Sequence, residues 1–448
     1  MLVVRRKFAN LLSADDYYKS IQPLFFFTHL IGITSCVVVS NESGFKSLAF
    51  SQLSHFVVIF VLTSFAYCCA YIVYYKATFI GHFLNTDITN GGEKAIVLAS
   101  GTTAVIILIT NTLRRRRLLC AFEYFPKIDK SFERIGIHWN YSRVLRNVIC
   151  RLIFTGFILV IMLIIYVGCW SRLNAYPSWQ LIFITFFQLT GIYFTVLLFG
   201  FLMLSTRVRI KALHKVLKNL AHQWDNSIVK PMPKQRSLQC LDSFSMYTIV
   251  TNNPCEIIQE SMEIHHMICD AASTANKYFT YQLLTIISIA FLIIVFDAYY
   301  VLETLLGKSA HESKFKTVEF VTFFSCQMIL YLIAIISIVE GSNRAIKKSE
   351  KTGGIVHSLL NKAKNAELKE KLQQFSLQLL HLKIHFTAAG LFNIDRTLYF
   401  TISGALTTYL IILLQFTSNN EPEQQLTTMG PNGTTPLQNL VSNLTADA

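Results

Sequence analysis

Apolar residues along this chain gather into eight stretches, and most of the charged residues lie between them. The stretches cover residues 21–40, 53–75, 92–112, 147–170, 178–205, 278–303, 317–340 and 398–416. An α-helix rises about 1.5 Å per residue and needs roughly 20 apolar residues to cross a bilayer. The pattern therefore predicts an all-α, polytopic membrane protein that forms a single membrane domain.

Two basic clusters predict how this domain is oriented. Arg5, Arg6 and Lys7 precede the first stretch, and four consecutive arginines at 114–117 follow the third. Because Lys and Arg mark cytoplasmic segments, an even number of crossings must separate the two clusters. Three stretches lie between them, and stretch 21–40 is the least apolar because it contains proline, histidine, glycine and several hydroxyl residues. We interpret it as an interfacial or re-entrant helix.

The remaining stretches predict seven transmembrane helices, with the amino terminus cytoplasmic and the carboxyl terminus extracellular. All but six of the 40 Lys and Arg residues then lie on the cytoplasmic side, as the positive-inside rule requires. The six on the outside are Lys76, Lys94, Arg172, Lys308, Lys314 and Lys316. A seven-helix G-protein-coupled receptor has its amino terminus outside, so the predicted topology is the inverse of that class.

This topology divides the chain into five parts. Residues 1–52 form a cytoplasmic amino terminus with the interfacial helix. Residues 53–340 hold transmembrane helices one to six, with cytoplasmic loops at 113–146 and 206–277. Residues 341–397 form cytoplasmic anchor helices, 398–416 form the seventh span, and 417–448 form an extracellular tail. The tail is rich in polar residues and proline and contains no Lys or Arg, which is typical of disorder.

Four Asn-X-Ser/Thr sequons test the topology, because only extracellular asparagines receive glycans. Asn432 and Asn443 lie in the predicted extracellular tail and are the expected glycosylation sites. Asn41 and Asn140 lie on the predicted cytoplasmic side and should stay unmodified.

Composition narrows the classes of function. Only 15% of the residues are charged, against about 25% in a soluble protein. The net charge of +14 is carried by segments between apolar stretches, so it does not predict nucleic acid as a partner. The ten cysteines show no C-x-x-C and no Cys/His metal spacing, and no P-loop, G-x-G-x-x-G or G-x-S-x-G motif is present. We therefore predict no metal, no cofactor and no enzyme activity.

The last apolar stretch, Leu398 to Phe416, has 19 residues without charge or proline, and it carries a polar face. Thr401, Thr408 and Gln415 recur every seven residues, so they lie on one side of a helix, with small residues between them. In one interpretation the threonines bond to their own helix carbonyls and the small residues admit a neighbouring helix. In the other, the face meets water along a path that several copies enclose.

Three segments of the chain resemble insect gustatory receptors. Thr408-Tyr409, five apolar residues and then Gln415-Phe416 resemble the TYhhhhhQF signature of that family, in the same last helix. The preceding AAGLFNIDRTL at 388–398 and the IQPLFFFTHLIGIT at 21–34 also resemble the family, most of all its gustatory receptor twenty-eight subfamily. The resemblance is strong over about the last 80 residues and diffuse elsewhere.

The resemblance implies a taste receptor that is itself a ligand-gated, non-selective cation channel in the plasma membrane of a sensory neuron. It implies a homotetramer, or a heteromer with related receptors, surrounded by membrane lipids and opened by a small organic tastant. The last helix would line the pore. Its pore and gate residues would be Thr401, Thr408, Tyr409, Ile412, Gln415 and Phe416. Ile412 and Phe416 lie one turn apart, so they can narrow a pore by dewetting.

A second periodic segment, 366–386, predicts a cytoplasmic helix. Its apolar residues have the 4,3,4,3,4 spacing of a coiled-coil seam. These residues are Leu368, Leu372, Phe375, Leu379, Leu382 and Phe386. The seam predicts either packing within the subunit or a subunit interface beneath the membrane, and the resemblance implies an anchor region that holds a tetramer together.

Aromatic and polar residues toward the outer half of spans three to six predict a pocket for a small organic ligand. The candidates are Tyr166, Trp170, Trp179, Gln188, Tyr193, Asp297, Tyr300, Phe324, Gln327 and Tyr331. The alternative is the belt of Trp and Tyr that membrane proteins place at lipid interfaces. Asp297 either faces a partner in the pocket or is exposed to solvent at the end of its span.

Three hypotheses follow for function. The first is a channel opened by a small organic ligand, and the second is the same channel opened by heat or light. The third is a membrane transporter, which would be expected to show internal repeats and broken helices that this sequence lacks. The ligand cannot be read from these residues, so bitter compounds, nucleosides and other small molecules all stay open.

Overall fold

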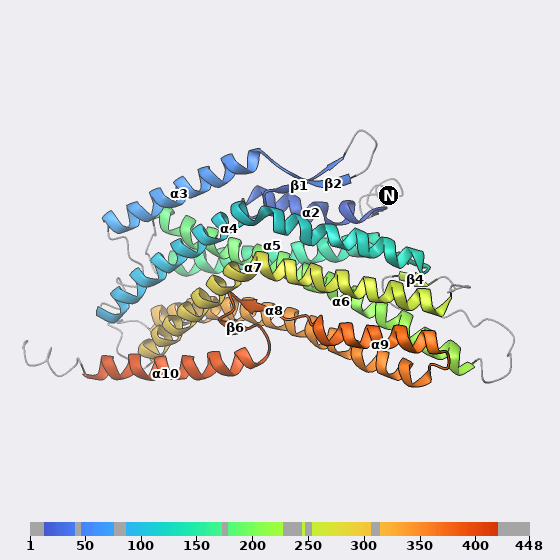
Figure 1. The fold of residues 1–448 in the computed structure, drawn as a ribbon. Helices are drawn as coiled ribbons and strands as arrows, with labels where there is room; N and C mark the ends of the chain where they lie inside the picture. The colour runs from blue at the N-terminus through green and yellow to red at the C-terminus, as the bar shows by residue number, and fades with distance from the viewer. Residues whose placement is uncertain are drawn as a thin grey trace, which may run out of the picture.

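The computed structural model describes residues 13–40, 46–75, 87–172, 178–226, 244–246, 253–305 and 314–419. They form an elongated bundle of long helices, with α3 and α10 at one end and the amino terminus and α9 at the other (Figure 1). The helices are α2 (Tyr17–Leu30), α3 (Leu53–Tyr75), α4 (Asp87–Arg134), α5 (Tyr141–Arg172), α6 (Trp179–Asn226), α7 (Pro254–Leu305), α8 (Lys314–Lys362), α9 (Ala366–His381) and α10 (Thr397–Asn419). The antiparallel strand pairs are β1 (Cys36–Ser40) with β2 (Lys46–Phe50), β3 (Ile137–Trp139) with β4 (Phe244–Met246), and β5 (Thr387–Ala388) with β6 (Phe392–Asn393).

Among the described residues, 7 helices are long and apolar enough to cross a membrane, namely α3 to α8 and α10. The prediction of seven transmembrane helices is confirmed at this level, and stretch 21–40 is not among them. The described chain starts at one end of the bundle, and α10 finishes at the other (Figure 1). This is expected for an odd number of crossings, because each crossing takes the chain to the opposite end of the bundle.

Four of the helices are far longer than a membrane crossing requires. Helices α4, α6, α7 and α8 contain 48, 48, 52 and 49 residues. At about 1.5 Å per residue each is more than twice as long as the roughly 30 Å hydrocarbon core. The segments 113–146 and 206–277, which the predicted topology makes the cytoplasmic connections between spans, therefore both begin as helix. Basic residues such as Arg114 to Arg117 are good helix formers and do not end α4.

The helical extension of α4 is held by its own apolar face. Leu118, Phe122, Phe125, Ile128 and Phe132 are at most 1% exposed. Their spacing of three or four residues places them on one side of the helix, against the rest of the bundle. Hydrophobic periodicity thus continues into a segment whose charges made it look like a loop.

An ion pair is buried where this extension meets α6. The guanidinium of Arg209 donates to Asp129 from Nε over 2.8 Å and from Nη2 over 2.6 Å, and the side chains are 6% and 1% exposed. Rings of Tyr17, Phe125 and Trp139 lie 4.4–5.5 Å from the guanidinium carbon. The bidentate ion pair and the surrounding aromatic rings therefore hold α2, α4, α6 and β3 together at one point.

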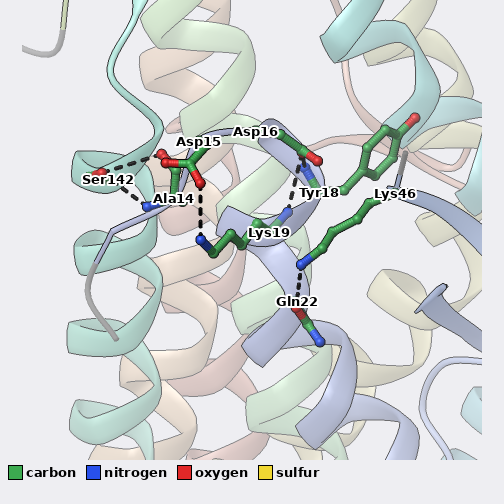
Figure 2. Close-up of polar contacts among 8 residues, drawn as sticks. All are labelled: Ala14, Asp15, Asp16, Tyr18, Lys19, Gln22, Lys46 and Ser142. Atoms are coloured by element: carbon green, nitrogen blue, oxygen red, sulfur yellow. Dashed lines mark hydrogen bonds and ion pairs between the residues drawn. The ribbon is translucent and has the colours of Figure 1, made fainter. Parts of the chain in front are cut away.

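The amino-terminal helix α2 docks onto α5 and the β1–β2 hairpin (Figure 2). Asp16 caps its start by accepting from backbone N–H groups of the first turn. The N–H of Ala14 donates to Ser142 Oγ over 3.0 Å, and Lys46 Nζ donates to Gln22 Oε1 over 3.3 Å. These contacts tie α2 to the beginning of α5 and to the first residue of β2.

Helix α2 ends beside α4 and does not cross the bundle. Its 14 residues span roughly 21 Å, which is shorter than a bilayer core. The chain turns at Gly32, whose φ of 86° favours glycine. Asn111 of α4 donates to the Gly32 carbonyl over 2.9 Å and accepts from the Tyr278 hydroxyl over 3.1 Å. These buried bonds fix the turn against α4 and α7.

The predicted seam at 366–386 packs within its own chain. Helix α9 ends at His381, so Leu382 and Phe386 lie beyond it, which corrects the expected length. Leu368, Leu372 and Phe375 are at most 7% exposed and belong to the same core as α7 and α8. The seam is therefore not free to form a subunit interface. The side chains that α9 exposes are different ones.

Candidate functional site

Helix α10 presents one apolar face to its own chain. Tyr399, Ile402, Leu406, Leu410 and Leu413 pack against the hydrophobic core of the bundle. They recur every three or four residues, as one side of a helix does. These contacts leave the rest of α10 uncovered. Only 6% of the residues in its most apolar 18-residue segment are buried, against 56% in the corresponding segment of α7.

The polar face of α10 is turned away from the bundle. Thr401, Thr408 and Gln415 are all exposed. At about 100° of rotation per residue, they lie on the side opposite Ile402 and Leu406. The structure thus places the three predicted polar residues together on the free side of the helix.

The threonines of this face also bond to their own helix. Thr408 Oγ1 donates to the carbonyl of Gly404 over 3.0 Å, and Thr401 Oγ1 donates to Thr397 over 3.4 Å. This agrees with the simpler of the two sequence interpretations for the hydroxyl protons. It leaves the hydroxyl oxygens able to accept from water, so the two interpretations are compatible.

The three remaining gate candidates differ in how they lie on α10: Ile412 and Phe416 are on its free side, and Tyr409 is at the edge of its packed face. Ile412 is 39% exposed and lies on the polar side, and Phe416 is 60% exposed one turn later. Tyr409 is 54% exposed, but its ring centroid lies 6.0 Å from that of Phe291 on α7. Tyr409 therefore lies at the edge between the free face and the packed face.

Seven of the ten predicted pocket residues line two adjoining cavities among α4, α5, α6, α7 and α8, which share part of their walls. They are Tyr166, Trp170, Gln188, Asp297, Phe324, Gln327 and Tyr331. The larger cavity holds about 70 Å³. The rings of Tyr166 and Trp170 are stacked with centroids 5.0 Å apart and form one wall.

The other three candidates lie elsewhere. Trp179 is 60% exposed and stacks on Tyr67, as the lipid-belt alternative expects. The Tyr193 hydroxyl donates to the carbonyl of Leu330 over 2.9 Å, and Tyr193 lines neither cavity. Tyr300 is buried behind Phe324, with ring centroids 5.3 Å apart. The sequence could not separate these aromatic residues from true cavity residues.

Asp297 is buried in the wall of the larger cavity, as the pocket interpretation expected, and the alternative of a solvent-exposed residue is wrong. Its exposure is 0%, and neither carboxyl oxygen has a hydrogen-bond partner in the part of the chain that the structure describes. A buried polar group without a partner is costly and is a common mark of a functional site.

Sequence reasoning missed a second carboxyl group on this cavity. Glu93 of α4 is 6% exposed and lines the same space as Asp297. A glycine explains its position, because a Cβ at Gly92 would lie 2.5 Å from the Phe296 ring and 2.7 Å from the Tyr300 hydroxyl. Gly92 allows α4 to press against α7. The sequence did contain a signal for this site, since Glu93 follows a glycine in the first turn of an apolar stretch, where a carboxylate is unusual.

The expected glycosylation sites Asn432 and Asn443 lie outside the described residues. They stay predictions.

Seven helices long and apolar enough to cross a membrane, packed around buried cavities with polar and aromatic walls, define a multi-pass membrane protein. Residues 21–420 match the family model described as 7tm chemosensory receptor, and the chain belongs to that family. It is a receptor and not an enzyme.

Relatives assign it to the gustatory receptor twenty-eight subfamily of insects. The chain is 54% identical to gustatory receptor 28b of Drosophila melanogaster over 427 residues, which is 93% of this chain and 89% of that protein. It is 33% identical to gustatory receptor 28a of the same species, with 90% and 92% covered. The resemblance to the gustatory receptor family is thereby confirmed.

A solved structure shares the fold. The insect olfactory receptor OR5 from Machilis hrabei, in complex with eugenol, is similar to this chain with a TM-score of 0.58. The two are 13% identical, and the alignment covers 90% of this chain and 100% of that one. Likeness at this identity concerns the arrangement of helices.

Proposed function

We propose that this receptor is a ligand-gated cation channel whose pore is lined by the polar face of α10. The observation that carries the proposal is that Thr401, Thr408 and Gln415 are exposed on the side of α10 that faces away from its own subunit. A polar face inside a membrane needs water or another protein surface. Copies of α10 around a common axis supply both, and no charged residue is present to make the path selective.

The proposed assembly is a homotetramer, and α9 offers a second reason for several copies. Leu377 and Leu380 are 58% and 64% exposed on the side of α9 opposite its buried seam. In the proposed topology α9 lies in the cytoplasm, where lipid cannot cover them. Exposed apolar side chains in water favour a protein interface. These two leucines, rather than the predicted seam, are the interface candidates.

The ligand is a small organic molecule that donates hydrogen bonds or carries positive charge. Asp297 and Glu93 line the cavity, and the Asp297 oxygens have no hydrogen-bond partner in the described chain. The cavity of about 70 Å³ is smaller than the roughly 300 Å³ of ordinary ligand pockets. Binding therefore requires the surrounding helices to move apart.

Helix α7 connects the cavity to the proposed pore. Asp297 lies on the cavity side of α7, and Phe291, six residues earlier, meets Tyr409 of α10. A ligand that holds α7 displaced would shift α10 through this ring contact. If the open arrangement binds the ligand more tightly, binding moves the equilibrium toward conduction.

Cysteine accessibility tests the pore. The protein is expressed alone in cells, and cysteines at Thr401, Thr408 and Gln415 are treated with a charged thiol reagent. Each should react and block cation current. Leu410→Cys is the matched control, because Leu410 packs against its own bundle and should stay unreactive. Equal reactivity on both faces, or full current after modification of Thr408→Cys, would refute a pore at this face.

A further inference from the structure

A groove separate from the ligand cavity opens between α5, α6 and α8. It encloses about 500 Å³ and is apolar at one end, where Phe154, Ile158 and Ile336 line it. At the other end it is lined by three arginines and one glutamate. The groove therefore has the two chemical environments of an amphiphile.

Two of the arginines are available to a ligand. Arg151 and Arg207 are half-buried, lie close enough for their like charges to interact, and make no hydrogen bond or ion pair within the described residues. Gly200 lies beside the guanidinium of Arg151, because a Cβ built there would be in van der Waals contact with Nη1, 3.7 Å away. Two neighbouring cations without a counter-ion favour an anion between them.

The third arginine and the glutamate already have partners. Glu340 accepts from Arg344 over 3.1 Å and from Arg396 over 2.8 Å. Its negative charge is shared by two cations, so it does not neutralise Arg151 and Arg207. The charged end of the groove stays positive.

The groove also has the right depth for a lipid. Arg207 and Arg344 lie just past the cytoplasmic ends of their apolar stretches, and Arg151 lies within the first turns of its own. Ile158 is seven residues beyond Arg151, about 10 Å deeper in the membrane. Phe154 and Ile336 are 63% and 48% exposed, so this part of the groove is open to the bilayer.

We propose that the groove binds one anionic phospholipid of the cytoplasmic leaflet per subunit. The headgroup phosphate lies between Arg151 and Arg207, and an acyl chain follows Phe154, Ile158 and Ile336. This rests on the topology of the proposed function but not on conduction. Zwitterionic lipids lack the net charge that the two arginines favour.

The site has a route to the proposed pore. Glu340 bonds both Arg344, which lines the groove, and Arg396, the residue before α10. A phosphate that attracts Arg344 competes with Glu340 for it. Lipid binding thereby changes the contact that holds the base of α10.

Native mass spectrometry of the purified full chain tests the site without measuring current. Detergent-solubilised protein is titrated with phosphatidylinositol 4,5-bisphosphate, phosphatidylserine or phosphatidylcholine. We expect one retained anionic lipid per subunit and weaker phosphatidylcholine binding. Arg151→Gln with Arg207→Gln should weaken anionic binding about 30-fold, since each basic residue near an anionic lipid contributes roughly fivefold.

Two further variants make the result decisive. Arg116→Gln with Lys130→Gln removes the same charge from exposed positions on α4 and should leave binding unchanged. Gly200→Leu keeps both arginines but fills the groove beside Arg151, and it should also lose the lipid. Equal loss in the α4 control, or equal retention of phosphatidylcholine by the wild type, would overturn the proposal. Either result leaves the channel proposal untouched, because no current is measured.

Discussion

Replacing Asp297 with leucine should have opposite effects on stability and on activation by ligand. Its carboxyl group is fully buried without a hydrogen-bond partner among the described residues. An unsatisfied buried polar group costs about 1–3 kcal/mol. Asp297→Leu removes that cost, so we expect it to raise the free energy of unfolding by about that amount and to raise Tm.

The same change should impair activation. Without the Asp297 acceptor, a ligand donor would be buried without a partner, which costs about 1–3 kcal/mol. The half-activating concentration of a donor-bearing agonist should therefore rise by roughly 5- to 150-fold. The maximal response should persist at high agonist concentration, because the pore is unchanged.

Both effects can be measured on one set of variants. Thermal stability is read by fluorescence-detected size-exclusion chromatography after heating, and activation by calcium imaging of cells that express the receptor alone. Tyr278→Phe is the control, because it removes the satisfied bond to Asn111, away from both cavities, and should lower stability without moving the dose–response curve. A less stable Asp297→Leu protein with an unchanged dose–response curve would refute the reasoning.

Four other predictions test separate parts of the structure. Asp129→Ala should destabilise the protein by about 3–5 kcal/mol by leaving Arg209 buried and unpaired, whereas replacing both with apolar residues should cost less, as thermal unfolding would show. Phe416→Ala should raise ligand-independent current in patch-clamp recordings by removing an apolar constriction, and unchanged basal current would count against this gate. Leu380→Glu should disperse the oligomer on native gels, and an intact tetramer would exclude α9 from the interface. Mass spectrometry of glycopeptides should find glycan only in the tail, and a glycan at Asn41 would mean that stretch 21–40 crosses the membrane.

The spanning helices could be predicted because burial in lipid leaves a local mark. Twenty apolar residues in a row have few alternatives to a transmembrane helix. The heptad seam of α9 was also visible, since Leu368, Leu372 and Phe375 repeat with helical spacing. Its partner was not, because the same period serves packing within a subunit and packing between subunits.

The parts that sequence missed depend on tertiary contacts. Arg209 lies in a basic segment like many solvated ones, and only the fold brings it to Asp129, 80 residues away. Asp297 and Trp179 both lie near the ends of spans, yet one is fully buried and the other is 60% exposed. Neighbouring helices decide that difference, and residue type does not.

Single-channel recording of the purified protein in a planar bilayer tests most directly whether α10 lines a cation pore. Gln415 is exposed on the polar face of α10, so a charge placed there would form a ring around the path. We expect discrete cation openings from the wild type, a larger conductance from Gln415→Glu and a smaller one from Gln415→Lys, because the two rings attract and repel cations. Absence of discrete currents, or equal conductance in both variants, would contradict the proposed pore.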